Sequence, residues 1–374
     1  MDELTYSLRD VWRAPRMGAS GKKIGVGLRA VAAAYLVYLV MGWLSWLAAG
    51  LEPGVIWTNC RLFPLSPGPA LGALPLFLFN AGLAGAVLTL MIGSAGAAKI
   101  TYRELKGDDF YGGSDAWKYA LEQGSSMIGV PVLLVGLSLL ILLLLYLLAL
   151  LLRIPGAGVL LGGLLALPAA ALALMGVWFG LGGLLAILYA PAVAGTTGED
   201  SLEGAIQVLG MMWAAPWRTA VYTAAALLAT LLAGWLLGLV TLAGLLLGGT
   251  LWMGAAGPGF RQLAAGAEAW LPDGAPAAAA RLLLPGPLHE GLPLFAPAAT
   301  GGGMAVQTGG FLLMFALLVI TALVAAYVLA SLASGLTAAY LVLRWRKDGE
   351  ELPGWSDEID ELEEGMEAGK VPDG

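Results

Sequence analysis

Charged residues are scarce in this chain. They make up 12% of its 374 residues, against roughly 25% in an ordinary soluble domain. Hydrophobic residues reach 59% and the mean hydropathy is +0.82, which is more apolar surface than a water-soluble domain can bury. The composition therefore excludes a soluble globular protein and indicates an integral membrane protein.

Histidine and cysteine occur once each, as His289 and Cys60. One histidine excludes a haem with two histidine ligands and a histidine-based zinc site. One cysteine excludes an intramolecular disulfide and a cysteine-based metal site. We therefore predict no metal and no cofactor.

Acidic residues and histidine are absent from the long apolar stretches of the chain. A carrier driven by protons or sodium normally keeps such a group within the membrane, although a charge there costs about 2.5 to 3.5 kcal/mol. The absence argues against ion-coupled transport, and the few peripheral polar groups argue against a membrane enzyme. Asn80 is the one strongly polar amide well inside a stretch, and we predict that it is a buried polar residue.

Six apolar stretches have at least the length of about 20 residues that is needed to cross a hydrocarbon core of about 30 Å. They run approximately over residues 26–51, 71–98, 126–152, 158–189, 219–256 and 308–343. In lipid each backbone polar group must be satisfied internally, and the stretches lack the alternating pattern of barrel strands. The sequence therefore predicts an all-α polytopic integral membrane protein with six transmembrane helices.

The fifth stretch is too long for one simple crossing, because it would measure about 56 Å as a single helix. We expect it either to project beyond the membrane or to break near Gly248-Gly249. Gly301-Gly302-Gly303 and Gly309-Gly310 suggest an irregular start to the sixth stretch. The external loop between them, 257–307, is expected to contain helical patches around 260–271 and 275–284. The prolines of the first external loop favour an extended connection.

Lysine and arginine are divided unevenly between the two sides of the six stretches. Fifteen lie on the side that carries both termini, and four lie on the other side: Arg61, Arg153, Arg261 and Arg281. By the positive-inside rule both termini are cytoplasmic. We predict a multi-pass protein of a prokaryotic cytoplasmic membrane, with a cytoplasmic amphipathic segment at 1–25, a membrane domain at 26–345 and a cytoplasmic tail at 346–374.

The tail is acidic, with eleven Asp or Glu residues and one Lys from Asp348 to Gly374. Within it Ile359, Leu362 and Met366 have the i, i+3, i+7 spacing of a thin apolar stripe on a short helix. Two interpretations stay open. The tail is either a solvated acidic segment or a helix whose stripe contacts a basic partner surface.

Short motifs recur where the chain returns to the cytoplasmic side. The motifs are Lys106-Gly-Asp-Asp, Thr197-Gly-Glu-Asp and a possible vestige, Lys347-Asp-Gly-Glu-Glu. The first two lead into short amphipathic helices, the earlier one with Ser114 as its predicted N-cap. We predict three helical hairpins, each introduced by a cytoplasmic interfacial helix. Chance similarity between short, gapped motifs is the alternative.

Aromatic and basic residues flank these motifs. Trp12, Arg13 and Arg16 before the first stretch, like Trp217 and Arg218 before the fifth, are predicted to contact lipid at the membrane interface.

Two further tryptophans, Trp117 and Trp213, are candidate contacts for a protein partner. The acidic pairs Asp108/Asp109 and Glu199/Asp200 are interpreted as helix caps, because carboxylates accept hydrogen bonds from the free N–H groups at helix starts.

Small residues four apart occur in several stretches. The pairs are Gly176/Gly180, Gly234/Gly238, Gly244/Gly248 and Ser331/Gly335. Such spacing lets helices approach closely in lipid, and we expect most of these pairs to pack within the chain.

The acidic turn, the Ser-Leu-Glu-Gly-Ala-Ile helix and the Trp/Pro/Arg entry between Leu184 and Ala226 resemble the membrane domain of bacterial glycerophosphodiester phosphodiesterases and related multi-pass proteins. A fainter copy covers residues 95–135. Active members of that group have their catalytic site in a separate soluble domain, which this chain lacks. The resemblance implies a membrane module without its own active site.

The sequence thus favours a non-catalytic membrane anchor, scaffold or accessory subunit of a larger assembly. Its expected partners are membrane lipids and other membrane or cytoplasmic protein subunits, with no nucleic acid. The alternative is a carrier or channel for lipid or another apolar solute, with a groove lined by Asn80 and the glycines of the stretches.

Overall fold

The computed structural model describes residues 5–66, 68, 72–270 and 303–349. Within these ranges the regular structure is helical, and six helices are long and apolar enough to cross a membrane. They are α3 (Gly21–Ala48), α5 (Ala73–Lys106), α7 (Gly124–Leu150), α8 (Ala157–Thr197), α10 (Pro216–Ala256) and α13 (Met304–Asp348). The chain is an all-α polytopic membrane protein, as its composition predicts.

Seven short helical elements join or precede the long helices. On one side lie α1 (Leu8–Trp12), α2 (Ala14–Gly18), α6 (Gly113–Glu122) and α9 (Ser201–Ala214). On the other lie α4 (Pro53–Cys60), the 3-10 turn η2 (Leu151–Arg153) and α11 (Pro258–Glu268). We call the first side, with the adjoining ends of the long helices, the joint face.

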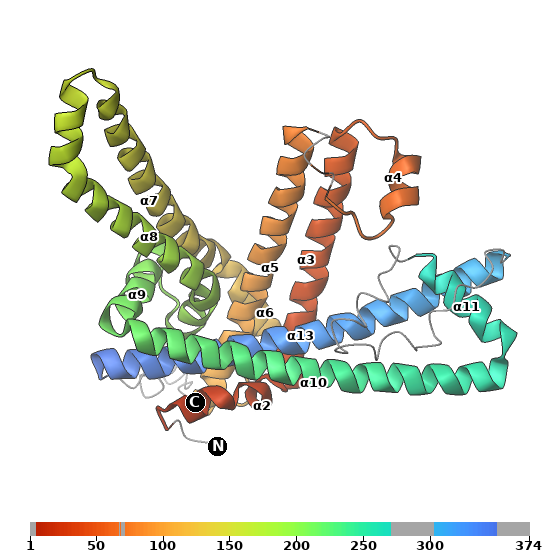
Figure 1. Cartoon of the computed structure of the whole chain (residues 1–374). Helices are drawn as coiled ribbons and strands as arrows, with labels where there is room; N and C mark the ends of the chain where they lie inside the picture. Colours follow the sequence, from red (N-terminus) through yellow and green to blue (C-terminus); the bar gives the residue numbers. More distant parts are fainter. Residues whose placement is uncertain (1–4, 67, 69–71, 271–302, 350–374) are drawn as a thin grey trace, which may run out of the picture.

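The long helices pair as three hairpins, α3 with α5, α7 with α8 and α10 with α13. Figure 1 shows the hairpins meeting at the joint face and leaving it in different directions, with α7–α8 directed away from α10–α13. The short helices α1–α2, α6 and α9 stand before the three hairpins in turn. This arrangement agrees with the predicted organisation of three hairpins, each introduced by short helices.

The buried part of the chain is concentrated at the joint face. Every residue in 95–102 of α5, 189–196 of α8 and 333–343 of α13 is buried. A helix that is buried on all sides is surrounded by other helices. The three returning helices are therefore enclosed at their joint ends, whereas their other halves expose large apolar side chains.

A glycine ends each of these three helices in the left-handed region. Gly107, Gly198 and Gly349 have φ values of 100°, 69° and 73°. Residues with a Cβ adopt this conformation at a cost, so glycine is the usual residue at this position after a helix. The glycine of the third motif, which the sequence suggested as a vestige, thus adopts the same left-handed conformation as the glycines of the other two.

The structure decides the open questions about the fifth and sixth stretches. Helix α10 is continuous over its 41 residues and does not break at Gly248-Gly249. Helix α13 already includes Gly309-Gly310, so the expected irregular start there is wrong. A Cβ on Gly310 would lie 2.2 Å from the carbonyl carbon of Gly266, so this glycine allows α11 to cross α13 closely.

The external loops differ in part from the predictions. Helix α11 confirms the first helical patch, and the second, 275–284, lies outside the described residues. The first external loop contains helix α4, so an extended connection over its whole length is wrong.

Small residues pack α2 against α13. Ideal Cβ atoms on Gly18 and Gly335 would lie 2.4 Å from the Cα of Ser331 and 2.7 Å from the Cβ of Ala14. The pair Ser331/Gly335 therefore faces a second small pair, Ala14/Gly18, at the same spacing. By contrast, a Cβ on Gly244 or Gly248 would meet nothing within 4 Å.

We expect Gly18→Ala to lower the stability of the chain by about 1 to 3 kcal/mol, because the new methyl group overlaps the backbone of α13. Gly244→Ala is the control, and it should leave stability unchanged or raise it by up to about 1 kcal/mol through helix propensity. Thermal unfolding in detergent measures both. Equal shifts in the two variants would show that the close approach does not matter.

Candidate functional site where the hairpins meet

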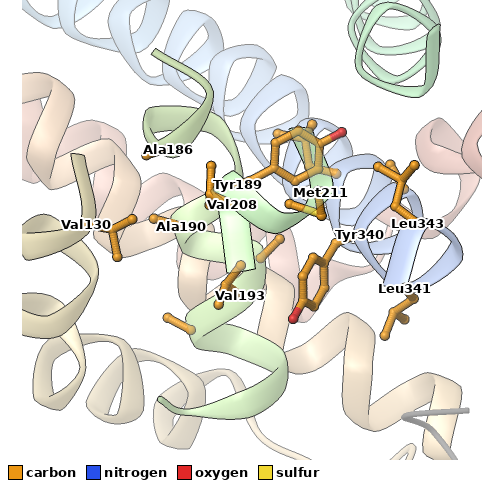
Figure 2. Packing of buried hydrophobic residues seen from close by; sticks show 14 of the residues in the cluster. Val130, Ala186, Tyr189, Ala190, Val193, Val208, Met211, Tyr340, Leu341 and Leu343 are labelled. Carbon is orange, nitrogen blue, oxygen red and sulfur yellow. The ribbon is translucent and has the colours of Figure 1, made fainter. Parts of the chain in front are cut away.

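Two buried tyrosines occupy equivalent places in the joint face. Tyr189 in α8 and Tyr340 in α13 each precede their terminal glycine by nine residues, and neither is exposed. Figure 2 shows both rings among the apolar side chains of the core. The Tyr189 hydroxyl shares a hydrogen bond of 2.8 Å with Thr223 of α10. The second hairpin is thereby linked to the third inside the core.

Tyr340 belongs to a polar network that joins α9 to α13. Its hydroxyl donates to the side-chain oxygen of Gln207, whose NH₂ group donates to the carboxylate of Glu199. The Arg344 guanidinium donates to the Tyr340 hydroxyl at 3.0 Å and lies 3.6 Å from the Asp348 carboxylate. Burial raises the pKa of Glu199, and the nearby positive charge of Arg344 opposes that rise.

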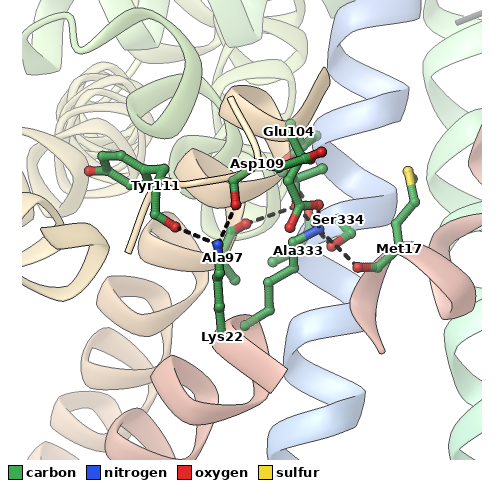
Figure 3. A network of polar contacts seen from close by, with 11 residues as sticks. Met17, Lys22, Ala97, Glu104, Asp109, Tyr111, Ala333 and Ser334 are labelled. Carbon is green, nitrogen blue, oxygen red and sulfur yellow. Dashed lines mark hydrogen bonds and ion pairs between the residues drawn. The ribbon is translucent and has the colours of Figure 1, made fainter. Parts of the chain in front are cut away.

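A second polar network ties the start of α3 to the end of α5 (Figure 3). Lys23 is fully buried, and its ammonium group lies 2.6 Å from the Glu104 carboxylate and donates to the Met17 carbonyl at 2.8 Å. Lys22 donates to the backbone carbonyls of Asp109 and Tyr111. Lys23 thus ties the two helices of the first hairpin together, and Lys22 holds this hairpin to the turn that follows it.

A buried hydroxyl pair joins the first hairpin to the third. Thr101 of α5 and Ser334 of α13 lie 2.9 Å apart and are both buried. With the Tyr189–Thr223 pair, this contact attaches the third hairpin to both of the others. Hydrogen bonds between helices satisfy hydroxyl groups that would otherwise be unpaired in an apolar core.

The joint face contains a pocket of about 370 Å³ between the N-terminal helices and the end of α5. It is lined by Asp10, Arg13, Arg16, Met17, Ala19, Ser20, Glu104 and Leu105. Asp10 is 1% exposed, accepts hydrogen bonds from Thr5 and Ser7, and lies 3.7 Å from Arg13. Glu104 pairs with Lys23, as described above, so each lining carboxylate has a cation partner.

The first and last described segments contact each other at the joint face. Tyr6 stacks on Trp345 with ring centroids 4.8 Å apart, and Arg346 donates to the Tyr6 carbonyl at 3.3 Å. Both ends of the described chain therefore lie on the same side of the molecule. This is consistent with the prediction that both termini lie on one side of the membrane. Which side of the membrane this is stays a prediction.

Helix α9 has two apolar faces. Ala205, Val208 and Met211 are buried in the core, whereas Leu202 and Ile206 are more than half exposed. An exposed apolar stripe on a short helix beside membrane-spanning helices is typical of a helix that lies at the membrane interface. This pattern is the one predicted for the interfacial helices.

The predicted lipid contacts are on the surface of the chain, apart from one. Trp12 and Trp217 are 45% and 78% exposed, and Arg16 and Arg218 are also exposed. Arg13 is half-buried, because it lies beside Asp10. Contact of these residues with lipid stays a prediction.

The predicted partner contacts have different environments. Trp213 is 79% exposed and makes an edge contact with Trp178, with centroids 6.0 Å apart. Trp117 is half-buried against a small cluster that includes Val26 and Ile100, so it contacts its own chain. The tail residues Ile359, Leu362 and Met366 lie outside the described residues.

Asn80 is not the buried polar residue that we predicted. Its side chain is exposed, and its NH₂ group donates to the carbonyl of Leu76 one turn earlier at 2.9 Å. A hydrogen bond within its own helix satisfies part of the amide without a partner helix. The pocket of the joint face is lined by other residues.

The acidic pairs are helix caps in part. Asp200 is the N-cap of α9. Asp108 accepts from the backbone N–H groups of Phe110 and Tyr111, which lie in the loop before α6, so its predicted role as a helix cap is wrong. Glu199 instead belongs to the network around Gln207. The predicted N-cap Ser114 lies inside α6, which begins one residue earlier after Gly112.

Sequence reasoning missed the residues at the centre of this site. Gln207 stands on the buried face of α9, and a lone amide on an otherwise apolar face could have indicated a buried partner. Tyr189 and Tyr340 would have been found by aligning the returning helices on their terminal glycines. Lys23 gave no such signal, because a lysine next to a membrane helix ordinarily faces water.

Comparison with protein-family models, curated proteins and solved structures finds no match to the chain. The resemblance to the membrane domain of glycerophosphodiester phosphodiesterases therefore stays a prediction.

We expect Tyr340→Phe to lower stability by about 1 to 3 kcal/mol, because the buried Gln207 amide oxygen loses its donor. The matched control is Tyr146→Phe, at a position that is 60% exposed on α7. Thermal unfolding in detergent should show a shift for the first variant and none for the control. An unchanged Tyr340→Phe variant would mean that the network adds no stability.

We also expect Glu199→Gln to change how stability depends on pH. A carboxyl group whose pKa is raised in the folded chain stabilises it at low pH, and this contribution is lost as the pH rises through the folded pKa. For Glu199 the loss begins near its ordinary value of 4.5 and continues above it. The wild type should therefore lose stability relative to Glu199→Gln between acidic and neutral pH.

Unfolding midpoints in a pH series measure this difference. Glu268→Gln, at an exposed position on α11, is the control and should leave the profile unchanged. A Glu199→Gln profile that runs parallel to that of the wild type would contradict the assignment.

Proposed function

We propose that the chain is a non-catalytic scaffold of a prokaryotic cytoplasmic membrane, acting as an anchor or accessory subunit of a larger assembly. The observation that carries this proposal is that the hairpins are joined firmly at one end and diverge beyond it (Figure 1). The joint face acts as a rigid base from which three separate apolar arms extend.

The apolar arms offer surface to other molecules. At the far end of the second hairpin, Leu160, Leu164 and Leu167 are 76% to 83% exposed. Such side chains can face lipid, other membrane subunits or both. In an assembly, the spaces between the arms are positions for further membrane helices.

Helix α10 has a specific surface for such a helix. Val240, Leu247 and Leu251 are 64% to 69% exposed and lie on the same side as Gly244 and Gly248, where a Cβ would meet nothing. Small residues four apart permit close packing of membrane helices. Other small pairs pack against helices of the same chain, whereas Gly244 and Gly248 contact no other helix. This pair therefore supports a contact with another subunit.

The joint face supports the location that we propose. The basic residues of the chain are concentrated on this side, which favours a cytoplasmic position under the positive-inside rule. The exposed residues Trp213, Trp217 and Arg218 then lie at the inner membrane interface. The acidic tail follows α13 in the sequence, and in this proposal it contacts a basic partner.

The alternative function, a carrier or channel for lipid or another apolar solute, has less support. It requires a groove lined by Asn80 and span glycines, but Asn80 is exposed and bonded within its own helix. The carrier or channel would become the favoured function if the purified chain is found without a second polypeptide and with a bound solute.

The proposal is tested by native mass spectrometry of the chain released from its membrane in mild detergent. We expect a species heavier than the 38.5 kDa chain that contains a second polypeptide. Replacing Gly244 and Gly248 together by Leu should dissociate it, because the larger side chains block close helix packing. Gly136→Leu, also at an open position, is the control on another arm.

A single chain with no second polypeptide in its native membrane extract would overturn the scaffold. A heavier species that persists after the double Leu replacement would be consistent with a scaffold, but it would show that α10 does not contact the second polypeptide. The mass of the second polypeptide distinguishes a copy of the same chain from a different subunit.

A further inference from the structure

The loop after α4 is bound to the side of α3 by a ladder of aromatic hydrogen bonds. Tyr35 and Tyr38 donate to the carbonyls of Leu62 and Pro64 at 2.8 and 2.5 Å. Trp43 and Trp46 donate to the carbonyls of Arg61 and Leu65 at 3.0 and 2.8 Å. Four side chains of one helix thus donate to four of the five backbone carbonyls of segment 61–65.

This ladder places the segment at membrane depth. Arg29 is the last charged residue of α3, and Tyr38 follows it by nine residues, or about 14 Å along a helix. That distance reaches the middle of a hydrocarbon core of about 30 Å. Irregular backbone is tolerated at this depth only where its polar groups have partners, and the four aromatic donors supply them.

Helix α4 completes this element. Its Trp57 lies between Trp43 of α3 and Trp270, with centroid distances of 6.1 and 5.9 Å. Trp270 in turn contacts Phe311 of α13 at 5.1 Å. Figure 1 shows α4 beside the outer part of α3 rather than beyond its end. Residues 53–65 therefore fold back along the outer part of α3, away from the joint face.

A pocket of about 350 Å³ lies between this element and α3. Its lining is Leu39, Val40, Trp43, Leu44, Trp57, Arg61 and Leu62. The walls are apolar, and Arg61 supplies the only charge among these residues. Within the described residues, no carboxylate lies within salt-bridge distance of Arg61.

We propose that this pocket binds one phospholipid in the leaflet opposite the joint face. Arg61 binds the lipid phosphate, and the Trp43, Trp57 and leucine walls hold the first part of an acyl chain. A guanidinium group at the edge of the hydrocarbon core requires an anionic partner, and it recognises phosphate through two parallel hydrogen bonds. Lipid is the phosphate-bearing molecule that also matches apolar walls.

The site is tested on the full chain purified in mild detergent from vesicles of phosphatidylethanolamine and phosphatidylglycerol that also contain diacylglycerol. Native mass spectrometry measures the lipid that remains bound after washing. We expect one retained phospholipid, and a loss of about tenfold or more in Arg61→Gln, as the removal of a charged hydrogen bond implies.

Two further variants make the test specific. Val40→Trp fills the pocket while Arg61 is kept, and it should release the lipid as well. Arg153→Gln is the matched control, because Arg153 is an exposed arginine on the same side of the membrane, and it should retain the lipid. If Arg61→Gln fails to fold, the comparison of bound lipid between the wild type and Val40→Trp still shows whether a lipid occupies the pocket.

Three results would overturn the proposal. The first is a wild-type chain that retains no more phospholipid than Val40→Trp. The second is a loss of lipid from Arg153→Gln as large as that from Arg61→Gln. The third is retention of diacylglycerol equal to that of phospholipid. The first result removes the site, the second removes the role of Arg61 and the third removes recognition of phosphate.

Discussion

The structure depends on the close packing of small residues where the three returning helices meet. Eight or more consecutive residues of α5, α8 and α13 are buried at this point, and many are Ala, Gly, Ser or Thr. Lipid gives no hydrophobic drive for helices to associate, so dispersion contacts between closely approaching backbones must hold them together. The three arms, the short helices and the polar networks all take their positions from this junction.

Polar groups at the junction give the packing its specificity. A hydroxyl pair joins the first hairpin to the third, another joins the second to the third, and the Gln207–Tyr340 contact places α9 on α13. Each group is buried, and an unpaired buried polar group is costly. Alternative arrangements that separate these partners are therefore disfavoured more strongly than apolar packing alone would require.

The two ends of each hairpin have different roles in the proposed scaffold. The joint end is rigid, because it contains the core and both described ends of the chain. The far ends are apolar surfaces, and among the described residues Trp57 of α4 meets Trp270, which also contacts Phe311 near the start of α13. A base with diverging arms suits a scaffold, and the aromatic ladder on α3 provides a separate place where the chain can hold lipid.

The sequence by itself determined the helical membrane class, the six long helices, the three hairpins with their introductory helices and the capping role of Asp200. These features are local, because they follow from apolar length, from turn glycines and from carboxylates beside free N–H groups. Only the tertiary structure decided that α10 is unbroken, that Asn80 is exposed, and that Lys23, Gln207 and Tyr340 are buried. The environment of such side chains depends on which helices lie beside them, and that choice depends on contacts between residues far apart in the chain.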